Sequence, residues 1–275
     1  MPKQKIETIS LYNEIHGRGE PLLLIAGLGS DSSSWGSVLK PFSARFQTIV
    51  FDNRGSGRSS LMKKPYTIRR LADDVITLLD YLGIKRVHVL GHSMGGYIAQ
   101  ELAINYPGRI NKLVLESTSF VSSKRNNLLF KGFLKRLRPD TDYEAWLRAW
   151  LPWLFSPKTL KNKKFMEMFI KLAGQYPYRQ TAEGFSGQVR AIASFDARER
   201  VKKIRAKTLI IEGEKDRLIV PREAKRLAEK IAGSEFCLLK NTGHSLHVES
   251  PKLFAKTVLR FLAFPDITGQ RQSLR

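Results

Sequence analysis

The sequence is poor in cysteine and has no long apolar run. Both absences limit the classes of protein to which the chain can belong. Its one cysteine, Cys237, cannot form a disulfide within the chain, which permits a reducing compartment. No stretch approaches the roughly 20 apolar residues of a membrane-spanning helix. Residues 1–7 contain no apolar segment of the kind that a signal peptide needs. We therefore expect a cytoplasmic globular protein with no membrane span.

Acidic residues are also scarce. The 275 residues include 25 Asp and Glu against 47 Lys and Arg, which gives a formal net charge of +22. Such a charge favours contact with something acidic, such as nucleic acid, anionic lipid or an acidic carrier protein. The alternative is a solvated basic surface that serves no partner. No nucleic-acid-reading module can be recognised, so we expect no nucleic-acid partner.

No motif indicates a cofactor. The polar turn D-N-R-G-S-G-R-S at 52–59 contains glycines, but it lacks both the G-x-G-x-x-G and the Walker spacing that bind phosphates. We interpret it as a structural loop whose Arg and Asp side chains tie it to its neighbours. We expect neither a metal ion nor an organic cofactor.

Apolar runs alternate with amphipathic stretches along most of the chain. Residues 6–15 predict an edge hairpin, and six runs predict buried strands: 21–26, 46–51, 87–90, 110–115, 207–211 and 235–239. Helical patterns lie among them at 67–82, 97–104, 221–231 and 251–262, and Ser32, Ser33 and Ser34 are candidate caps of a short helix that carries Trp35. The alternation predicts an α/β protein with a mostly parallel central sheet and helices on both faces. The tail at 266–275 has no such pattern, and we expect it to be frayed.

The alternation breaks between residues 120 and 192. This stretch contains no good strand, and its basic and aromatic helical segments are separated by prolines. We interpret 120–192 as a helical cap inserted into a core domain formed by 1–119 and 193–275. The cap holds 14 Lys and Arg against five Asp and Glu.

The most informative stretch is G-H-S-M-G-G at 91–96, between a predicted strand and a predicted helix. A G-x-S-x-G in this context is the nucleophile elbow, in which a sharp turn exposes a serine and the glycines allow close backbone packing. Ser93 is therefore the candidate nucleophile. The backbone N–H groups of Leu28, in a glycine-rich turn after a strand, and of Met94 are the candidate oxyanion hole.

Serine needs a base, and the base needs an acid to orient it. Of the five histidines, His244 follows a strand and a glycine and is the best candidate base, ahead of four others: His16, His88, His92 and His247. His92 belongs to the elbow but points away from Ser93. Asp216 follows a strand and completes the chain order Ser, Asp, His, so it is the candidate acid. The alternative acids are Glu116, Glu212 and Glu214.

Tryptophans gather in the cap. Trp146 and Trp150 lie four residues apart and share a helix face, and Trp153 follows closely. These side chains are candidates to line an apolar substrate pocket. Packing of the cap onto the core is the alternative.

With these residues in place, the chain resembles the α/β-hydrolase family from residue 8 to 262. The resemblance rests on G-H-S-M-G-G at 91–96, D-N-R-G-S-G-R-S at 52–59, G-E-K-D-R-L-I-V-P at 213–221 and T-G-H-S at 242–245. The chain is most similar to small bacterial carboxylesterases of the group that holds enol-lactonases and pimeloyl-carrier-protein methyl esterases. The resemblance implies an acyl-enzyme on Ser93, His244 as base and then acid, and Asp216 as the group that orients it.

The sequence departs from that family at two positions. Relatives usually have His-Gly in the oxyanion loop, where this chain has Ala26-Gly27. Carbon–carbon bond hydrolases of the fold usually carry Trp after the catalytic His, where this chain has Ser245. We therefore expect a serine hydrolase of carboxylic esters with short to medium acyl chains, acting on a small-molecule ester.

Three further functions stay open. Two are enzymatic, an esterase for acyl groups on an acidic carrier protein and a carbon–carbon bond hydrolase. The third is a non-catalytic ligand receptor on a hydrolase scaffold, and the intact set of Ser93, Asp216 and His244 counts against it.

Overall fold

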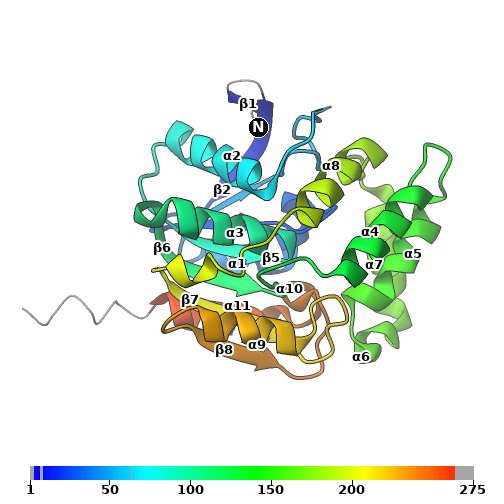
Figure 1. Ribbon diagram of the computed structural model, residues 1–275. Coiled ribbons are helices and arrows are strands. Elements are labelled where there is room, and N and C mark those ends of the chain that lie inside the picture. Colours follow the sequence, from blue (N-terminus) through cyan, green and yellow to red (C-terminus); the bar gives the residue numbers. More distant parts are fainter. Residues whose placement is uncertain (1–2, 7–8, 63, 264–275) are drawn as a thin grey trace, which may run out of the picture.

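A single twisted sheet runs through the molecule (Figure 1). The computed structural model describes residues 3–6, 9–62 and 64–263, and the predicted frayed tail lies outside them. In this part of the chain eight strands are arranged in the order β1-β2-β4-β3-β5-β6-β7-β8. Their bounds are β1 Lys3–Ile6, β2 Ile9–His16, β3 Pro21–Ile25, β4 Gln47–Phe51, β5 Val87–His92, β6 Ile110–Glu116, β7 Lys207–Gly213 and β8 Glu235–Leu239.

The strands from β3 to β8 pair in parallel, and only the edge differs. There β1 and β2 form an antiparallel pair, and β2 pairs antiparallel with β4. The predicted hairpin and the mostly parallel sheet are therefore confirmed. Because parallel strands place their carboxyl ends at one edge of a sheet, the loops after β3, β5, β6, β7 and β8 gather there.

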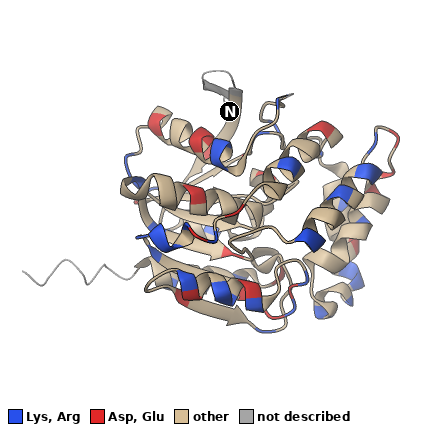
Figure 2. Ribbon diagram, viewed as in Figure 1, with Lys and Arg blue, Asp and Glu red and all other residues tan. Residues whose placement is uncertain are grey.

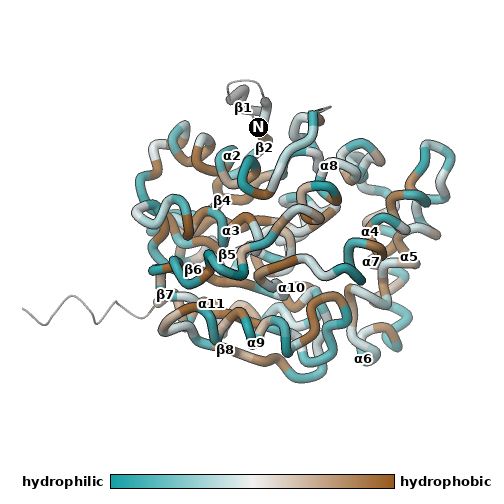
Figure 3. Tube along the Cα trace, viewed as in Figure 1, coloured by the Kyte–Doolittle hydropathy of each residue, from teal (hydrophilic) through white to brown (hydrophobic). Residues whose placement is uncertain are grey.

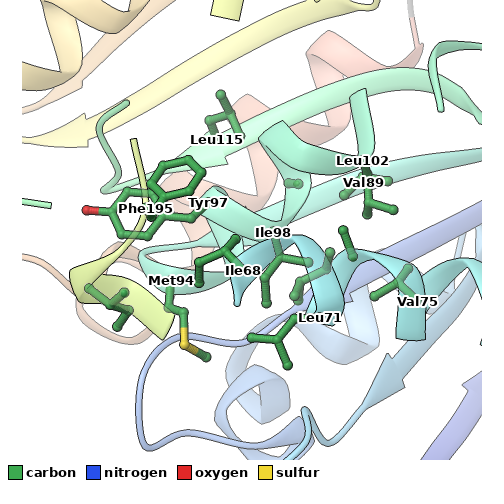
Figure 4. Packing of buried hydrophobic residues seen from close by; sticks show 14 of the residues in the cluster. Ile68, Leu71, Val75, Val89, Met94, Tyr97, Ile98, Leu102, Leu115 and Phe195 are labelled. Atoms are coloured by element: carbon green, nitrogen blue, oxygen red, sulfur yellow. The ribbon is translucent and has the colours of Figure 1, made fainter. Parts of the chain in front are cut away.

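Helices cover both faces of the sheet (Figure 1). One face is covered by α2 (Ile68–Tyr81), α3 (Met94–Asn105) and α9 (Pro221–Lys230), and the other by α1 (Gly36–Ser43) and α11 (Pro251–Ala263). Successive strand residues point to opposite faces, so Leu23 joins the first cluster while Leu22 and Leu24 join the second. Figure 4 shows the first cluster, where side chains of α2 and α3 meet those of β5 and β6.

Hydrophobic stretches run through the middle of the molecule and hydrophilic ones gather at its outer turns (Figure 3). None of the helices in the described ranges combines the length and the apolar character that crossing a membrane would require.

Between β6 and β7 the described chain forms helices and no named strand. They are α4 (Lys124–Arg136), α5 (Tyr143–Leu154), α6 (Pro157–Leu160), α7 (Lys163–Gln175) and α8 (Ala182–Ala193). In Figure 1, α4 to α7 stand to one side of the sheet and α8 leads back along the core. Lysine and arginine occur on these helices and also on α9 (Figure 2). The boundaries of the cap, 120–192, stay predictions. Binding of an acidic carrier protein to this basic segment also stays a prediction.

Two local details differ from the predictions. The helix after the 91–96 turn begins at Met94, three residues earlier than its apolar periodicity indicates. The short helix with Trp35 is a 3-10 turn, Ser32–Trp35, and its cap is Asp31, whose side chain accepts from the Ser33 N–H. The serines that we expected to cap this helix lie inside it, because an Asp one residue earlier takes the capping position.

The polar turn at 52–59 is held by ionic and hydrogen-bonded contacts. Asp52 accepts hydrogen bonds from Ser32 and Arg58, at 2.6 to 3.1 Å. Arg54 makes a two-pronged ion pair with Asp74 of α2, at 2.7 and 2.8 Å, and both side chains are buried. Burial raises the pKa of the Asp74 carboxyl, although Arg54 opposes this shift. These contacts agree with the interpretation of a structural loop.

The turn between β5 and α3 packs its backbone closely against the end of β3. Ser93 has φ of 55° and ψ of −114°, in a region that non-glycine residues rarely occupy. A Cβ atom at Gly95 would lie 2.0 Å from the Ile25 carbonyl oxygen, and one at Gly91 would lie 2.3 Å from the Gly95 oxygen. Only glycine fits at either position, so the sequence pattern around Ser93 follows from the packing of β3 against this turn.

We predict that Gly95→Ala destabilises the fold by about 3 kcal/mol or more, because the new methyl group would overlap a backbone carbonyl that cannot move away. The matched control is Gly108→Ala, since a Cβ at Gly108 meets no atom within 4 Å. Chemical denaturation followed by circular dichroism measures both variants. Equal stability of the two would contradict the packing argument.

Candidate active site

The loops at the carboxyl edge of the sheet bring the predicted residues into one region. Ser93 follows β5 and Leu28 follows β3, which pairs with β5. Asp216 and His244 follow β7 and β8, which are also neighbours. The strand between these two groups is β6, which ends at Glu116. The strand order therefore places the nucleophile on one side of β6 and the candidate base and acid on the other.

His244 and Asp216 are in direct contact. The His244 Nδ1 atom lies 2.7 Å from Asp216 Oδ2, and both side chains are buried. The other oxygen of Asp216 accepts from the backbone N–H groups of Leu218 and Ile219, at 2.7 and 3.0 Å. Those two donors fix the carboxylate. With Nδ1–H donating to Asp216, Nε2 of His244 carries the lone pair that a general base uses.

A second carboxyl group lies beside this pair. Glu212 is fully buried in β7, and its Oε1 accepts from the Gly213 N–H at 2.8 Å. Burial, and then the negative charge of Asp216, raise the pKa of Glu212 well above its usual range. The environment of Glu212 therefore favours the neutral form of its carboxyl group.

The remaining candidate acids, Glu116 and Glu214, bond groups outside the His244–Asp216 pair. Glu116 contacts His247, whose Nδ1 lies 2.8 Å from Glu116 Oε1 and whose backbone N–H donates to the same oxygen at 3.1 Å. Glu214 accepts from the Asn241 N–H at 3.1 Å. Two of the candidate histidines are paired with surface or edge residues: His16 with Glu14 and His88 with Glu20.

His92 lies on the face of the sheet opposite α3. Its Nε2 is 3.1 Å from the carbonyl oxygen of His244, and its ring packs edge-on against Trp35. Burial, followed by the nearby His244 and His247, lowers the pKa of His92 well below its usual range. His92 is therefore neutral, and its N–H supports the loop that carries His244. No local sequence pattern indicates this contact.

One group of metal-ligating side chains occurs among the residues that the structure describes. Ligand atoms of His92, Glu116 and His247 all lie within 4.8 Å of one another. Hydrogen bonds within the protein already engage Nε2 of His92 and Nδ1 of His247. The cluster is thus explained as a pair of buried histidines that support neighbouring loops.

The loop after β3 packs against the elbow. A Cβ atom at Gly27 would lie 3.3 Å from Ser93 Cβ, so the residues at 27 and 28 border the serine. Within the described ranges, the N–H groups of Leu28 and Met94 have no hydrogen-bond acceptor in the protein. Unpaired N–H groups beside the half-buried Ser93 can stabilise a developing oxyanion. Their assignment as the oxyanion hole stays a prediction.

The cap tryptophans lie in an aromatic cluster. Trp150 stacks on Phe133 with ring centroids 3.8 Å apart, and Trp146 and Trp150 both meet the ring of Phe185 edge-on. Trp146 Nε1 donates to the Phe133 carbonyl oxygen at 3.1 Å. Trp153 is half-buried under the guanidinium of Arg217, 5.1 Å from its ring. A role for the three in substrate binding stays a prediction.

Comparison with known proteins gives the same fold. A family model described as the alpha/beta hydrolase fold matches residues 20–251. The "putative carbamate hydrolase RutD" of Azorhizobium caulinodans is 30% identical over 255 residues, covering 91% of this chain and 94% of that protein. The protein of the same name from a Caulobacter strain is 29% identical over 260 residues, covering 92% and 96%.

Solved structures of other proteins show the same fold. The enol-lactonase from Burkholderia xenovorans superposes with a TM-score of 0.87 at 28% identity. The superposition covers 96% of this chain and 100% of the enol-lactonase chain. A thermophilic esterase from Thermogutta terrifontis gives a TM-score of 0.83 at 26% identity, covering 92% and 93%. With the elbow, the sheet order and a family match over most of the sequence, the chain belongs to the α/β-hydrolase fold family and is a hydrolase of that fold.

Proposed function

We propose that this hydrolase cleaves carboxylic esters with short to medium acyl chains through an acyl-enzyme on Ser93. The observation that carries the proposal is the buried His244–Asp216 pair, 2.7 Å apart, at the sheet edge where the strained Ser93 also lies. A serine hydroxyl is a weak nucleophile until a base removes its proton, and an imidazole fixed by a carboxylate is such a base.

In this proposal the reaction has two halves. The Oγ atom of Ser93 attacks the ester carbonyl carbon while Nε2 of His244 takes the hydroxyl proton. The carbonyl oxygen becomes an oxyanion that accepts from the N–H groups of Leu28 and Met94. When the tetrahedral intermediate collapses, the bond to the alcohol oxygen breaks and His244 returns the proton to that oxygen. Water then attacks the acyl-enzyme by the same route and releases the acid.

Two features of the site stabilise the charges that develop during the reaction. The helix α3 begins directly behind Ser93, so its partly positive N-terminus favours negative charge on the reacting oxygen. Asp216 stabilises the imidazolium that forms on His244.

A carbamate is the second candidate substrate class, because relatives that match nearly the whole chain are named as putative carbamate hydrolases. The same residues could attack a carbamate carbonyl. However, the nitrogen of a carbamate donates electron density to that carbonyl and lowers its electrophilicity. An ester is therefore the better match to an activated serine without further electrophilic assistance.

The first prediction for this site is that Ser93→Ala lowers kcat for 4-nitrophenyl butyrate by about 10⁴-fold or more, because it removes the nucleophile. The matched control is Ser117→Ala, since Ser117 also follows a strand with a positive φ, of 47°, but its side chain is buried. That control should keep most of the activity. Near-parental hydrolysis by a folded Ser93→Ala enzyme would refute the proposed nucleophile.

The second prediction separates the two buried carboxylates. Asp216→Asn should lower kcat by roughly 10³- to 10⁴-fold near neutral pH, because the amide neither favours the right tautomer of His244 nor stabilises its charged form. Glu116→Gln is the control, since that side chain bonds His247 instead. Steady-state kinetics on both variants decide the assignment, and a reversed order would make Glu116 the catalytic acid partner.

The third prediction concerns the substrate class. Release of 4-nitrophenol from the butyrate ester should exceed release from 4-nitrophenyl dimethylcarbamate by at least about tenfold in kcat/KM. The two substrates share a leaving group, so the ratio reports the acyl part alone. Multiple-turnover hydrolysis of the carbamate at an equal or higher kcat/KM would instead assign the chain to carbamate hydrolysis.

A further inference from the structure

A buried glutamine of the cap segment bonds the loop that carries the proposed oxyanion donor. The side chain of Gln188, on α8, is fully buried, and its Oε1 accepts from the Gly29 N–H at 3.0 Å. Gly29 immediately follows Leu28. The contact joins residues 159 positions apart in the sequence and connects the helical cap with the loop after β3.

The orientation of the Gln188 amide is fixed by its other partners. Its Nε2 donates to the Arg54 carbonyl oxygen at 3.0 Å and to Ser56 Oγ at 2.7 Å. A carbonyl oxygen can only accept and a backbone N–H can only donate. If the amide were turned over, its NH₂ group would face the Gly29 N–H and its oxygen would face the Arg54 oxygen. The acceptor must therefore face Gly29.

An apolar contact of the same helix reinforces this one. Gly29 has φ of +69°, and a Cβ atom there would lie 3.3 Å from the ring of Phe185. Phe185 lies one turn before Gln188 and is fully buried, with Trp146 and Trp150 edge-on to its ring. Helix α8 thus holds Gly29 by a hydrogen bond on one side and by a packed aromatic ring on the other.

The loop needs such support because glycine lies on both sides of Leu28. Gly27 and Gly29 rotate more freely than other residues, so the peptide groups around Leu28 have little intrinsic preference. Within residues 27–30, one hydrogen bond closes a turn, from the Ser30 N–H to the Gly27 oxygen at 3.3 Å. The hydrogen bond to Gln188 holds the same backbone from a distant part of the chain. Fixing the peptide group at Gly29 limits rotation of the Leu28 N–H.

We propose that Gln188 is a positioning residue for the oxyanion hole. It acts through Gly29 and touches no reacting atom, and the inference rests on the proposed acyl-enzyme mechanism at Ser93. Preorganised donors contribute mainly in the transition state. Loss of the Gly29 contact therefore lowers kcat and leaves KM nearly unchanged, whereas loss of substrate contacts in the cap would raise KM.

Gln180 supplies a matched control. It is also buried where the cap meets the core, and its amide bonds to the Gly55 oxygen, the Thr181 oxygen and Ser56 Oγ, at 2.8 to 3.2 Å. These bonds tie the cap to the 52–59 turn, whereas those of Gln188 reach the loop at 27–29 as well. Methionine has nearly the shape of glutamine, so Gln→Met removes the polar contacts of either residue at similar cost in packing.

The experiment measures kcat and KM for 4-nitrophenyl butyrate in four full-length variants: Gln188→Met, Gln188→Glu, Gln180→Met and Ser93→Ala. Gln188→Met should lower kcat by about 10- to 100-fold with KM changed by less than about threefold, since losing an oxyanion donor outright costs about 10²- to 10³-fold. Gln188→Glu keeps an acceptor for the Gly29 N–H but sets a second oxygen against the Arg54 carbonyl oxygen, so it should recover only part of the kcat lost in Gln188→Met. Gln180→Met should remain near the parent.

Four results would overturn the proposal. A folded Gln188→Met enzyme with parental kcat would do so, as would equal losses in Gln188→Met and Gln180→Met, which would mean that the amides only hold the cap. If Gln188→Met does not fold, Gln188→Asn replaces it, because its shorter amide withdraws from Gly29. Full activity of that variant would also overturn the proposal. Activity of Ser93→Ala reports separately on the proposed mechanism, and its retention would refute both.

Discussion

The contact between the backbone at Gly95 and the carbonyl oxygens at the end of β3 determines the geometry of the whole site. It brings the start of α3, the serine before it and the loop at 27–29 into one small volume. The same turn is held from β6, because the Ser93 N–H donates to the Glu116 oxygen and Thr118 Oγ1 donates to the Ser93 oxygen, each at 2.9 Å. The strained backbone of Ser93 persists because three strands hold it.

Burial of several acidic and imidazole groups beneath this turn is tolerable because few of them are charged without a partner. Asp216 and Glu116 each face a histidine and at least one backbone N–H group, whereas burial raises the pKa of Glu212 and lowers the pKa of His92, which favours the neutral form of each. The neutral groups still shape the site, since His92 supports the loop of His244. The charge of the region can therefore change at His244 without creating another unpaired buried charge.

The sequence predicts the sheet, the elbow and most helices because each depends on local patterns that a few residues carry. The pairing of acids with bases is different. Glu116 and Asp216 both follow apolar strands, and His244 and His247 lie three residues apart, so local patterns cannot assign the pairs. The structure decides because Val114 and Glu116 point to the face of the sheet that holds Trp35 and His247.

Contacts between distant segments were the least predictable. A short-range contact was missed as well: Asp31 was not recognised as a cap because four successive residues, from Asp31 to Ser34, could accept from N–H groups of the same turn. Gln188 was missed because glutamine in an amphipathic helix is most often a surface residue, and its partners lie more than a hundred positions away. Only the packing of α8 against the loops at 27–29 and 54–56 makes these residues important.

The two ends of the predicted cap segment meet where it joins the core. Val121 and Asp196 form an isolated bridge, and the Ala197 N–H donates to the Phe120 oxygen at 2.8 Å, so the two ends leave the core side by side. Insertions within α4 to α7 would therefore extend outward without separating β6 from β7. Helix α8 lacks that freedom, because its buried polar side chains bond loops beside Ser93. Substitutions on the buried face of α8 would therefore disturb the backbone at 27–29 and 54–56, beside the candidate nucleophile.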